Sequence, residues 1–434
     1  MSTRLHMTLA VVLAISSVSF AERGKVPQGL KDFHAEGTDL WIYNDIKKAM
    51  AEAKKQNKPI FVTFRCVPCH ACKSFDAEVA KGSKRVADIA KEHFISVRQV
   101  EMKDVDLNLF QFDYDLNWAA MFINAEGVVY ARYGTQSAEG PDAYNSIESL
   151  AKTMNRVVEL HKAYPKNKDE LTGKRGKDKP YSTALEMPGL LRKDKFRGTT
   201  SRQNCIHCHN IHDAEQYTAQ KNKTFTFDMM YRYPLPENIG LRMDRDEGTM
   251  IKSTETVARR AGLRPRDVIT HVGGQRIVSI ADMQWVLHNL SDNNTKVDLQ
   301  VKRGSKSSTH AIQLAKGWKK TDFSWRGSMW SVKPRPGFWA PLLKEDELRK
   351  RRLPTNRKIT HVKWINTGSP EGRSAKNAGL RHGDVIIGVG NKAYDMTPRE
   401  FNLHLRLNYR VGDKLPLTVL RGGKKMQITI PLVE

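Results

Sequence analysis

Two stretches far apart in the chain repeat one another and constrain the fold of its C-terminal half. Residues 261–275 read AGLRPRDVITHVGGQ, and residues 378–392 read AGLRHGDVIIGVGNK. Each combines the end of a short helix, a turn before an aspartate, a β-rich strand and a turn of Gly or Asn residues. Residues with helical spacing follow in both places, and then two strands with alternating apolar positions. This pattern predicts two copies of one small domain.

The two copies resemble the PDZ modules that are attached to bacterial HtrA-type periplasmic proteases. The resemblance implies modules over residues 234–316 and 317–434, each a partly open β-barrel with helices. Such modules hold a terminal carboxylate in a loop and add an extended peptide as a strand. The residues implied for the two loops are Asn238, Ile239, Gly240 and Leu241 in the first copy, and Gly337, Phe338 and Trp339 in the second.

In the first copy the peptide groove is expected between residues 241–244 and a helix over residues 279–290. A packing module with an unused groove is the alternative for each copy. The chain contains neither G-x-S-x-G nor a Ser, His and Asp set in the context of a protease. We therefore expect these modules to bind a protein or an exposed peptide, and we do not expect a protease.

The stretch RCVPCHAC at residues 65–72 holds three of the chain's five cysteines. It follows the β-rich run KPIFVTF and precedes the helix-like run SFDAEVA, so the cysteines stand at a strand-to-helix junction. There the N–H groups of a helix N-terminus favour a thiolate over a thiol. The neighbouring pattern predicts a helix over residues 40–56, a strand over 94–102, a hairpin over 119–134 and a closing helix that ends near His161.

This order of elements, with the run FVTFRCVPC, resembles the thioredoxin-like family over residues 22–166. The resemblance implies an α/β domain in which Cys66 is the attacking thiol and Cys69 the resolving thiol. Two positions depart from the family. Trp118 and two alanines stand where the family has a cis-proline, and Arg65 replaces the aromatic residue before the first cysteine. Arg65 is expected to lower the pKa of the neighbouring thiol by Coulomb attraction.

Cys72 adds a third thiol one helical turn beyond Cys69. It would resolve a disulfide or act as a third soft ligand for a metal such as copper or zinc. Cys66, Cys69 and His70 also spell C-x-x-C-H, so haem at this stretch is an alternative. A thioredoxin-like fold with inert cysteines is another.

A second C-x-x-C-H, the run CIHCH at residues 205–209, stands in a loop context. Two thiols at this spacing bond the vinyl groups of a haem, and the next histidine binds its iron. The motif therefore predicts haem c on Cys205 and Cys208, with His209 as the proximal ligand. Zinc held by these cysteines and by histidines including His207 is an alternative, as is a disulfide or unmodified thiols. The candidates for a distal haem ligand are Met229, Met230 and His212.

The N-terminus predicts export. Arg4 precedes an apolar run over residues 7–15, and small residues lead to Ala21, as in a cleavable signal peptide over residues 1–21. A membrane anchor is the alternative, although the run is too short to span a bilayer comfortably. Export would place the chain in the periplasm or cell envelope, where disulfides persist.

The formal net charge of +25 is spread over the whole chain. Because export removes most nucleic-acid partners, we interpret this charge as solvated surface, with acidic partners or anionic envelope polymers as the alternative. The basic residues 167–233 lack sustained periodicity and predict an exposed, irregular linker that carries the CIHCH run.

These features predict an exported redox protein. A thioredoxin-like dithiol and a covalent haem would act on an envelope partner that the PDZ modules recruit, as a thiol-disulfide oxidoreductase or an electron-transfer protein. The alternative is a non-catalytic PDZ scaffold or metal-binding protein with a degenerate thioredoxin fold. Haem-based sensing with the PDZ pair as output is a third interpretation.

Overall fold

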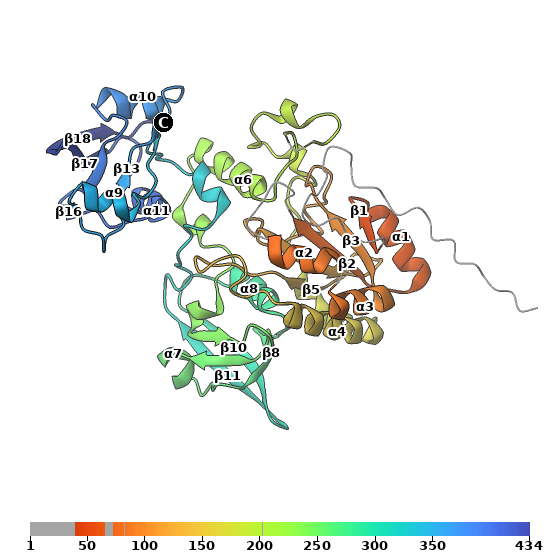
Figure 1. The fold of residues 1–434 in the computed structure, drawn as a ribbon. Coiled ribbons are helices and arrows are strands. Elements are labelled where there is room, and N and C mark those ends of the chain that lie inside the picture. The colour runs from red at the N-terminus through yellow and green to blue at the C-terminus, as the bar shows by residue number, and fades with distance from the viewer. Residues whose placement is uncertain (1–39, 66–72, 82, 202) are drawn as a thin grey trace, which may run out of the picture.

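Three folded parts follow one another along the chain (Figure 1). Among the residues described, no helix is both long and apolar enough to cross a membrane. The predicted signal peptide and the cysteines Cys66, Cys69 and Cys72 lie outside the described residues, as does His70. The computed structural model describes residues 40–65, 73–81, 83–201 and 203–434.

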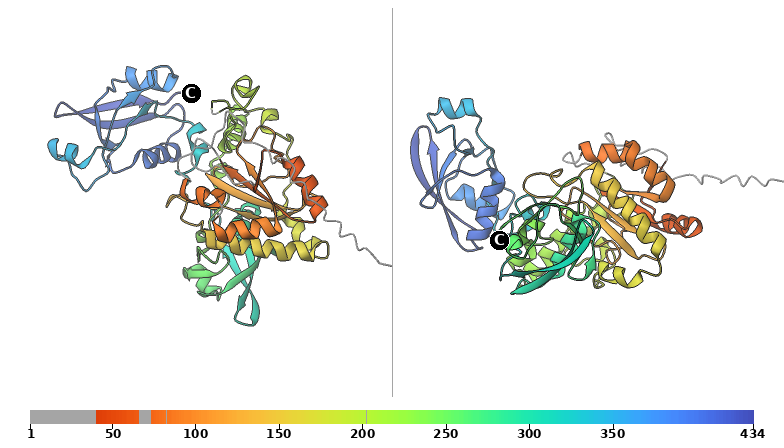
Figure 2. Two further views of the ribbon diagram at one scale, coloured as in Figure 1. Left: turned by 45° about the vertical axis from the view of Figure 1, so that its right-hand side comes forward. Right: turned by 90° about the horizontal axis from the view of Figure 1, so that it is seen from below.

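A five-stranded sheet with helices on both faces forms the N-terminal domain (Figure 2). The first three strands in space are parallel, and the last two are antiparallel to their neighbours. In spatial order they are β1 (Trp41–Tyr43), β3 (Ile95–Gln99), β2 (Ile60–Arg65), β4 (Trp118–Ile123) and β5 (Val129–Tyr133). One face packs against α1 (Ile46–Gln56), and the other against α2 (Lys73–Lys81), α3 (Lys84–His93) and α4 (Ile147–Ala163).

The N-terminal domain contains the predicted elements, with two differences. Trp41–Tyr43 forms an edge strand rather than the start of a helix, and all three of its side chains are buried. The helix begins at Ile46, because Asp45 caps it by accepting a hydrogen bond from the backbone N–H of Lys48 at 2.8 Å. Helix α3 is a further element that the sequence pattern did not separate from α2.

The segment over residues 167–233 is largely exposed up to residue 201, as its composition predicts, but individual residues in it are buried. Before α6 (His209–Lys221) it consists of short helical turns, as irregular as expected. Lys174 is nevertheless buried, because its ammonium group pairs with Asp282 at 2.7 Å. Apolar side chains at irregular intervals also pack into the hydrophobic clusters of the N-terminal domain, and periodicity cannot reveal such contacts. They are Leu171, Ala184, Met187 and Leu190.

The first repeat consists of a two-stranded sheet and a four-stranded sheet of order β11-β10-β8-β9, with two helices. A short 3-10 helix, η5 (Pro236–Ile239), leads into it. Its elements are β6 (Leu241–Met243), β7 (Ile251–Thr254), α7 (Thr256–Arg260), β8 (Val268–Val272), β9 (Gln275–Arg276), α8 (Ile280–Asn289), β10 (Thr295–Arg303) and β11 (Lys306–Leu314).

The second repeat has the same order of elements, with an added helix and strand where the sequence has its longer insertion. Neither repeat closes into a barrel within the described residues, so the sheets are open rather than the partly open barrels that were expected. After η6 (Gly327–Ser331), the elements are β12 (Phe338–Trp339), α9 (Glu345–Lys350), β13 (Thr360–His361), β14 (Trp364–Ile365), α10 (Pro370–Asn377), β15 (Val385–Val389), β16 (Lys392–Ala393), α11 (Pro398–Asn408), β17 (Lys414–Arg421) and β18 (Lys424–Pro431).

The two repeats also share a close contact between a glycine and a helix. Gly240 and Gly337 precede the first strand of their repeats and adopt left-handed backbone angles, with φ of 76° and 74°. A Cβ on Gly337 would lie 2.4 Å from the backbone nitrogen of Gly372 in α10. A Cβ on Gly240 would lie 3.3 Å from the backbone nitrogen of Ala258 in α7. Only a residue without a side chain fits both the angle and the contact.

We expect Gly337→Ala to destabilise the second repeat by about 3 kcal/mol, the sum of a left-handed alanine and a backbone clash. Gly423→Ala is the matched control, because Gly423 has a φ of 81° and open space around its Cβ position. The free energy of unfolding of this control should fall by about 1 kcal/mol. Urea unfolding measures both losses, and equal losses would show that the contact with α10 carries no energy.

Candidate functional site

A buried ion network joins the end of β2, which the cysteine stretch follows in the sequence, to the start of β4. Asp76 of α2 accepts a hydrogen bond from Arg98 Nη2 at 2.7 Å and pairs with Arg65 Nε at 2.8 Å. The indole of Trp118 donates to the other oxygen of Asp76 at 3.0 Å. Charge-assisted bonds of this kind are strong where water is excluded. One carboxylate therefore fixes Arg65, the residue directly before Cys66.

Trp118 is the first residue of β4, in the stretch of residues 118–120 where the resemblance implies a cis-proline. Its ring packs edge-on against Phe75 of α2, with ring centroids 4.9 Å apart. The cis peptide bonds of the described residues precede Pro165 and Pro334. At the start of β4 the chain thus has a buried indole that is hydrogen-bonded to Asp76.

The CIHCH run forms the entry to α6 and is largely buried. Cys205 and Cys208 are 4% and 8% exposed, and burial raises the pKa of the Cys205 thiol. A thiol kept neutral in this way is a poor nucleophile. Burial, with a smaller contribution from the charge of His209, lowers the pKa of His207 to about 4, so that its imidazole is neutral at pH 7.

His209 is oriented as metal-ligating histidines often are. Its Nδ1 lies 3.0 Å from Asp213 Oδ2, one turn further along α6. A carboxylate at this position favours the tautomer with its proton on Nδ1 and its lone pair on Nε2. The ring packs against Gly327 of η6, where a Cβ would come within 3.1 Å of it.

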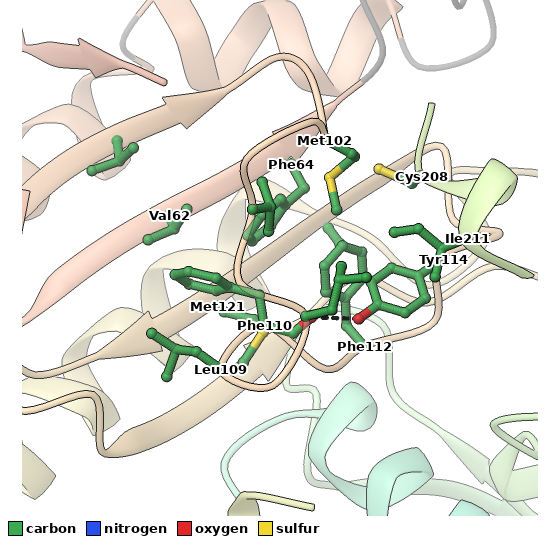
Figure 3. Close-up of a cluster of buried hydrophobic side chains, with 14 of the residues drawn as sticks. Val62, Phe64, Met102, Leu109, Phe110, Phe112, Tyr114, Met121, Cys208 and Ile211 are labelled. Carbon is green, nitrogen blue, oxygen red and sulfur yellow. Dashed lines mark hydrogen bonds between the residues drawn. The ribbon is translucent and has the colours of Figure 1, made fainter. Parts of the chain in front are cut away.

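The two thiols of CIHCH lie in different hydrophobic clusters. Cys205 belongs to the cluster on the α4 face of the sheet, and Cys208 to the cluster on the α1 face. Figure 3 shows Cys208 beside Met102, Tyr114 and Ile211. In this arrangement both thiols are buried inside the N-terminal domain.

The other predicted ligands do not converge on CIHCH either. Met230 is buried in a separate cluster with Phe323 and Met329. Met229 is half-buried, and its carbonyl accepts a hydrogen bond from Arg232 Nε at 2.6 Å. The described residues bring together one group of three potential metal ligands within 4.8 Å, and no cysteine is among them. It consists of Asp113, Asp115 and His212.

An arginine fills this group, which makes it a structural ion network. Arg326 Nη1 donates to both oxygens of Asp113 at 2.7 and 2.8 Å and to Asp115 at 3.2 Å. Burial alone would raise the pKa of Asp115, but the hydrogen bond and charge of His212 and the charge of Arg326 hold it well below its usual range. The sequence signal for this network was the D-x-D of the apolar run LFQFDYDL, because two acids in such a run require partners.

The helix expected to line the groove of the first repeat packs against the N-terminal domain. Asp282 of α8 accepts the backbone N–H of Arg132 in β5 at 2.9 Å and the ammonium group of Lys174 at 2.7 Å. Gln284 accepts a hydrogen bond from the hydroxyl of Thr135 at 2.7 Å. These groups are buried, so α8 is fixed to the edge of the five-stranded sheet.

Tyr144, from the segment between β5 and α4, enters the core of the first repeat. It packs in the same cluster as Ile239, and its hydroxyl donates to Glu237 at 2.9 Å. Arg242 of β6 holds Glu139 of the same segment through two hydrogen bonds of 3.1 and 2.8 Å. Between this segment and the start of α8 there is a cavity of about 10 Å³, no more than one water molecule requires. The chain's own segment therefore closes the predicted groove.

The residues predicted to bind a peptide carboxylate are largely part of the cores of the repeats. Asn238 donates to two backbone carbonyls, and Ile239 and Leu241 are fully buried. Phe338 is buried against α11, whereas Trp339 is 44% exposed. Of the predicted side chains, that of Trp339 is thus the one that reaches far into solvent.

Two protein families match parts of the chain. The description of one is thioredoxin-like, over residues 41–125, and that of the other is PDZ domain, over residues 238–314. The chain contains a thioredoxin-like domain and a PDZ domain. The second repeat has the element order of this PDZ domain but lies outside the matched residues.

Whole-chain comparisons add little to these matches. No curated protein matches the chain. The solved HtrA-type protease AlgW with decapeptide is 17% identical over 31% of this chain and 41% of that chain, with a TM-score of 0.21. A variant of that protease with decapeptide is 16% identical over 42% of this chain and 54% of that chain, with a TM-score of 0.23.

We expect Tyr144→Ala to open the closed groove of the PDZ domain. Loss of a buried aromatic side chain lowers the free energy of unfolding by about 3 kcal/mol. The backbone amides of β6 should then exchange with deuterium faster. Tyr217→Ala is the matched control, because Tyr217 is 40% exposed on α6. Unchanged exchange in β6 of the Tyr144 variant would contradict closure by this segment.

Proposed function

We propose that the chain is an exported thiol-disulfide exchange protein of the periplasm or cell envelope. The observation that carries the proposal is the junction between β2 and α2, where the cysteine stretch of a thioredoxin-like domain directly follows Arg65. Asp76 holds the Arg65 guanidinium in a buried position. A cation fixed there favours the thiolate form of Cys66. The predicted signal peptide, with its route to an oxidising compartment, supports the same proposal.

The exchange needs only the chain's own thiols and a disulfide in the partner. The Cys66 thiolate attacks one sulfur of the partner disulfide and releases the other as a thiolate. Cys69 or Cys72 then attacks Cys66 in the mixed disulfide and releases the second partner thiolate. Two electrons pass to the partner, its two thiolates take up protons, and the chain keeps an internal disulfide.

Insulin reduction with dithiothreitol as the source of electrons tests this proposal. We expect Cys66→Ala to lose at least about tenfold in rate, because the attacking thiolate is gone. Cys205→Ala should keep most of the rate, since Cys205 is buried away from solvent. Comparison of Cys69→Ala with Cys72→Ala identifies the resolving thiol. A wild-type chain that does not reduce insulin would contradict the proposal and favour a PDZ scaffold with inert cysteines.

Haem c at CIHCH is the second candidate, favoured by the motif and by the bond between Asp213 and His209. When bound, haem supplies one-electron chemistry. The residues that would hold it are Cys205, Cys208 and His209, and they would first have to leave the two clusters that bury the thiols. Zinc or copper at these residues would need the same rearrangement. Haem attachment therefore stays a prediction of the motif, and the exchange of disulfides does not depend on it.

The test for haem is a visible spectrum of the denatured protein in pyridine. The protein is first expressed and exported together with the cytochrome c maturation machinery. Absence of a band of covalently bound haem would agree with the burial of both thiols and contradict the haem prediction. A band that is lost in Cys205→Ala and kept in Cys66→Ala would instead assign haem to CIHCH. It would show that the thiols become accessible before the chain folds.

A further inference from the structure

The outer face of the second repeat's two-stranded sheet carries two tryptophans. Trp339 of β12 and Trp364 of β14 are directly opposite one another, and they are 44% and 56% exposed. Cross-strand partners at this spacing form one continuous apolar surface. A chain that is otherwise strongly basic and polar thus presents two large indoles to solvent at a single place, and such patches mark interaction sites.

The first repeat serves as an internal comparison for this face. The carbonyl of Gly240 accepts from the N–H of Glu255, and that of Gly337 accepts from the N–H of Asn366, so the two strand pairs are in the same register. At the positions of the tryptophans the first repeat has the pair Arg242 and Ser253. The paired tryptophans are therefore not required by the fold of the repeat.

In the first repeat the corresponding face has an occupant from the chain itself. Arg242 holds the carboxylate of Glu139 with two hydrogen bonds, and its guanidinium lies 5.9 Å from the ring centroid of Tyr144. The segment held at Arg242 thus offers an acidic side chain, and its aromatic side chain continues into the core of the repeat. It shows what kind of segment a strand pair of this geometry can hold.

A basic cavity adjoins the tryptophans of the second repeat. It has a volume of about 500 Å³ and lies between β14 and the end of α10. Trp364 and Leu380 contribute apolar surface, and no carboxylate is among the described residues that line it. Its basic side chains are Lys363, Lys376, Arg381 and His382.

We propose that this face binds an acidic peptide segment with an apolar side chain, supplied by a partner protein. The apolar side chain would pack on Trp339 and Trp364, and carboxylates would pair with Lys363, Lys376 and Arg381. The net charge of +25 favours an acidic partner and opposes a second copy of this chain. The proposal rests on the proposed function, since it names the partner that the chain presents to its thiols.

The test uses a short synthetic peptide of glutamates around one phenylalanine, blocked at both ends so that no terminal carboxylate can enter a PDZ loop. Its affinity for the full chain is measured by calorimetry. We expect Arg381→Glu to weaken binding at least about tenfold, because an attractive charge becomes a repulsive one. Trp364→Ser, which introduces the residue type of the first repeat, should weaken it about fivefold to tenfold.

Lys54→Glu is the matched control, with the same change of charge at an exposed position on α1. It should change the affinity less than about twofold at physiological salt. Equal weakening by Lys54→Glu and Arg381→Glu would show attraction by net charge alone and overturn the proposal. No binding to the wild type, or unchanged binding in Trp364→Ser, would overturn it as well.

Two further measurements separate the other outcomes. Wild-type dimers in light scattering that disappear in Trp364→Ser would assign the face to self-association and overturn the proposal. Insulin reduction by Trp364→Ser should equal that of the wild type, because insulin does not need the recruiting face. Cys66→Ala should bind the peptide normally, so failure of the thiol function and failure of this site give different results.

Discussion

The guanidinium of Arg326 determines how the second half of the chain is attached to the first. It bonds two aspartates of the thioredoxin-like domain, and one of these, Asp115, also holds His212 of α6. All of these groups are buried. A buried charge that loses its partner costs about 3 to 5 kcal/mol. The thioredoxin-like domain, α6 and the chain leading to the second repeat therefore stabilise one another.

A second buried network applies the same constraint to the PDZ domain. Asp282 on α8 bonds Arg132 of β5 and Lys174, and both Asp282 and Lys174 are buried. With α8 fixed in this way, the segment that carries Tyr144 lies on β6 and fills the groove. The PDZ domain consequently packs against the thioredoxin-like domain through α8 and through the segment that carries Tyr144. The exposed tryptophan pair that we propose for an outside partner belongs to the second repeat.

Local sequence patterns were sufficient for several parts of the fold. The β-rich run KPIFVTF and the helix-like run SFDAEVA predicted β2, α2 and the position of the cysteine stretch between them. The repeated AGL and aspartate predicted two units of the same element order, and both are present. The edge strand at Trp41 was missed because three apolar residues suit the end of a helix as well as a strand. The buried residues of the linker were missed because they follow no period.

The candidate sites show the same difference between local and long-range signals. The C-x-x-C-H spacing is a local signal, so the sequence shows it, but burial of Cys205 and Cys208 depends on residues of the sheet and of the 102–114 loop. By itself the sequence determined which thiols, repeats and loops the protein has, since turn chemistry and hydrophobic period act over a few neighbouring residues. Only the tertiary structure decided which of them solvent and partners can reach. Contacts such as Arg326 with Asp113 join positions 213 residues apart, and no local pattern encodes them.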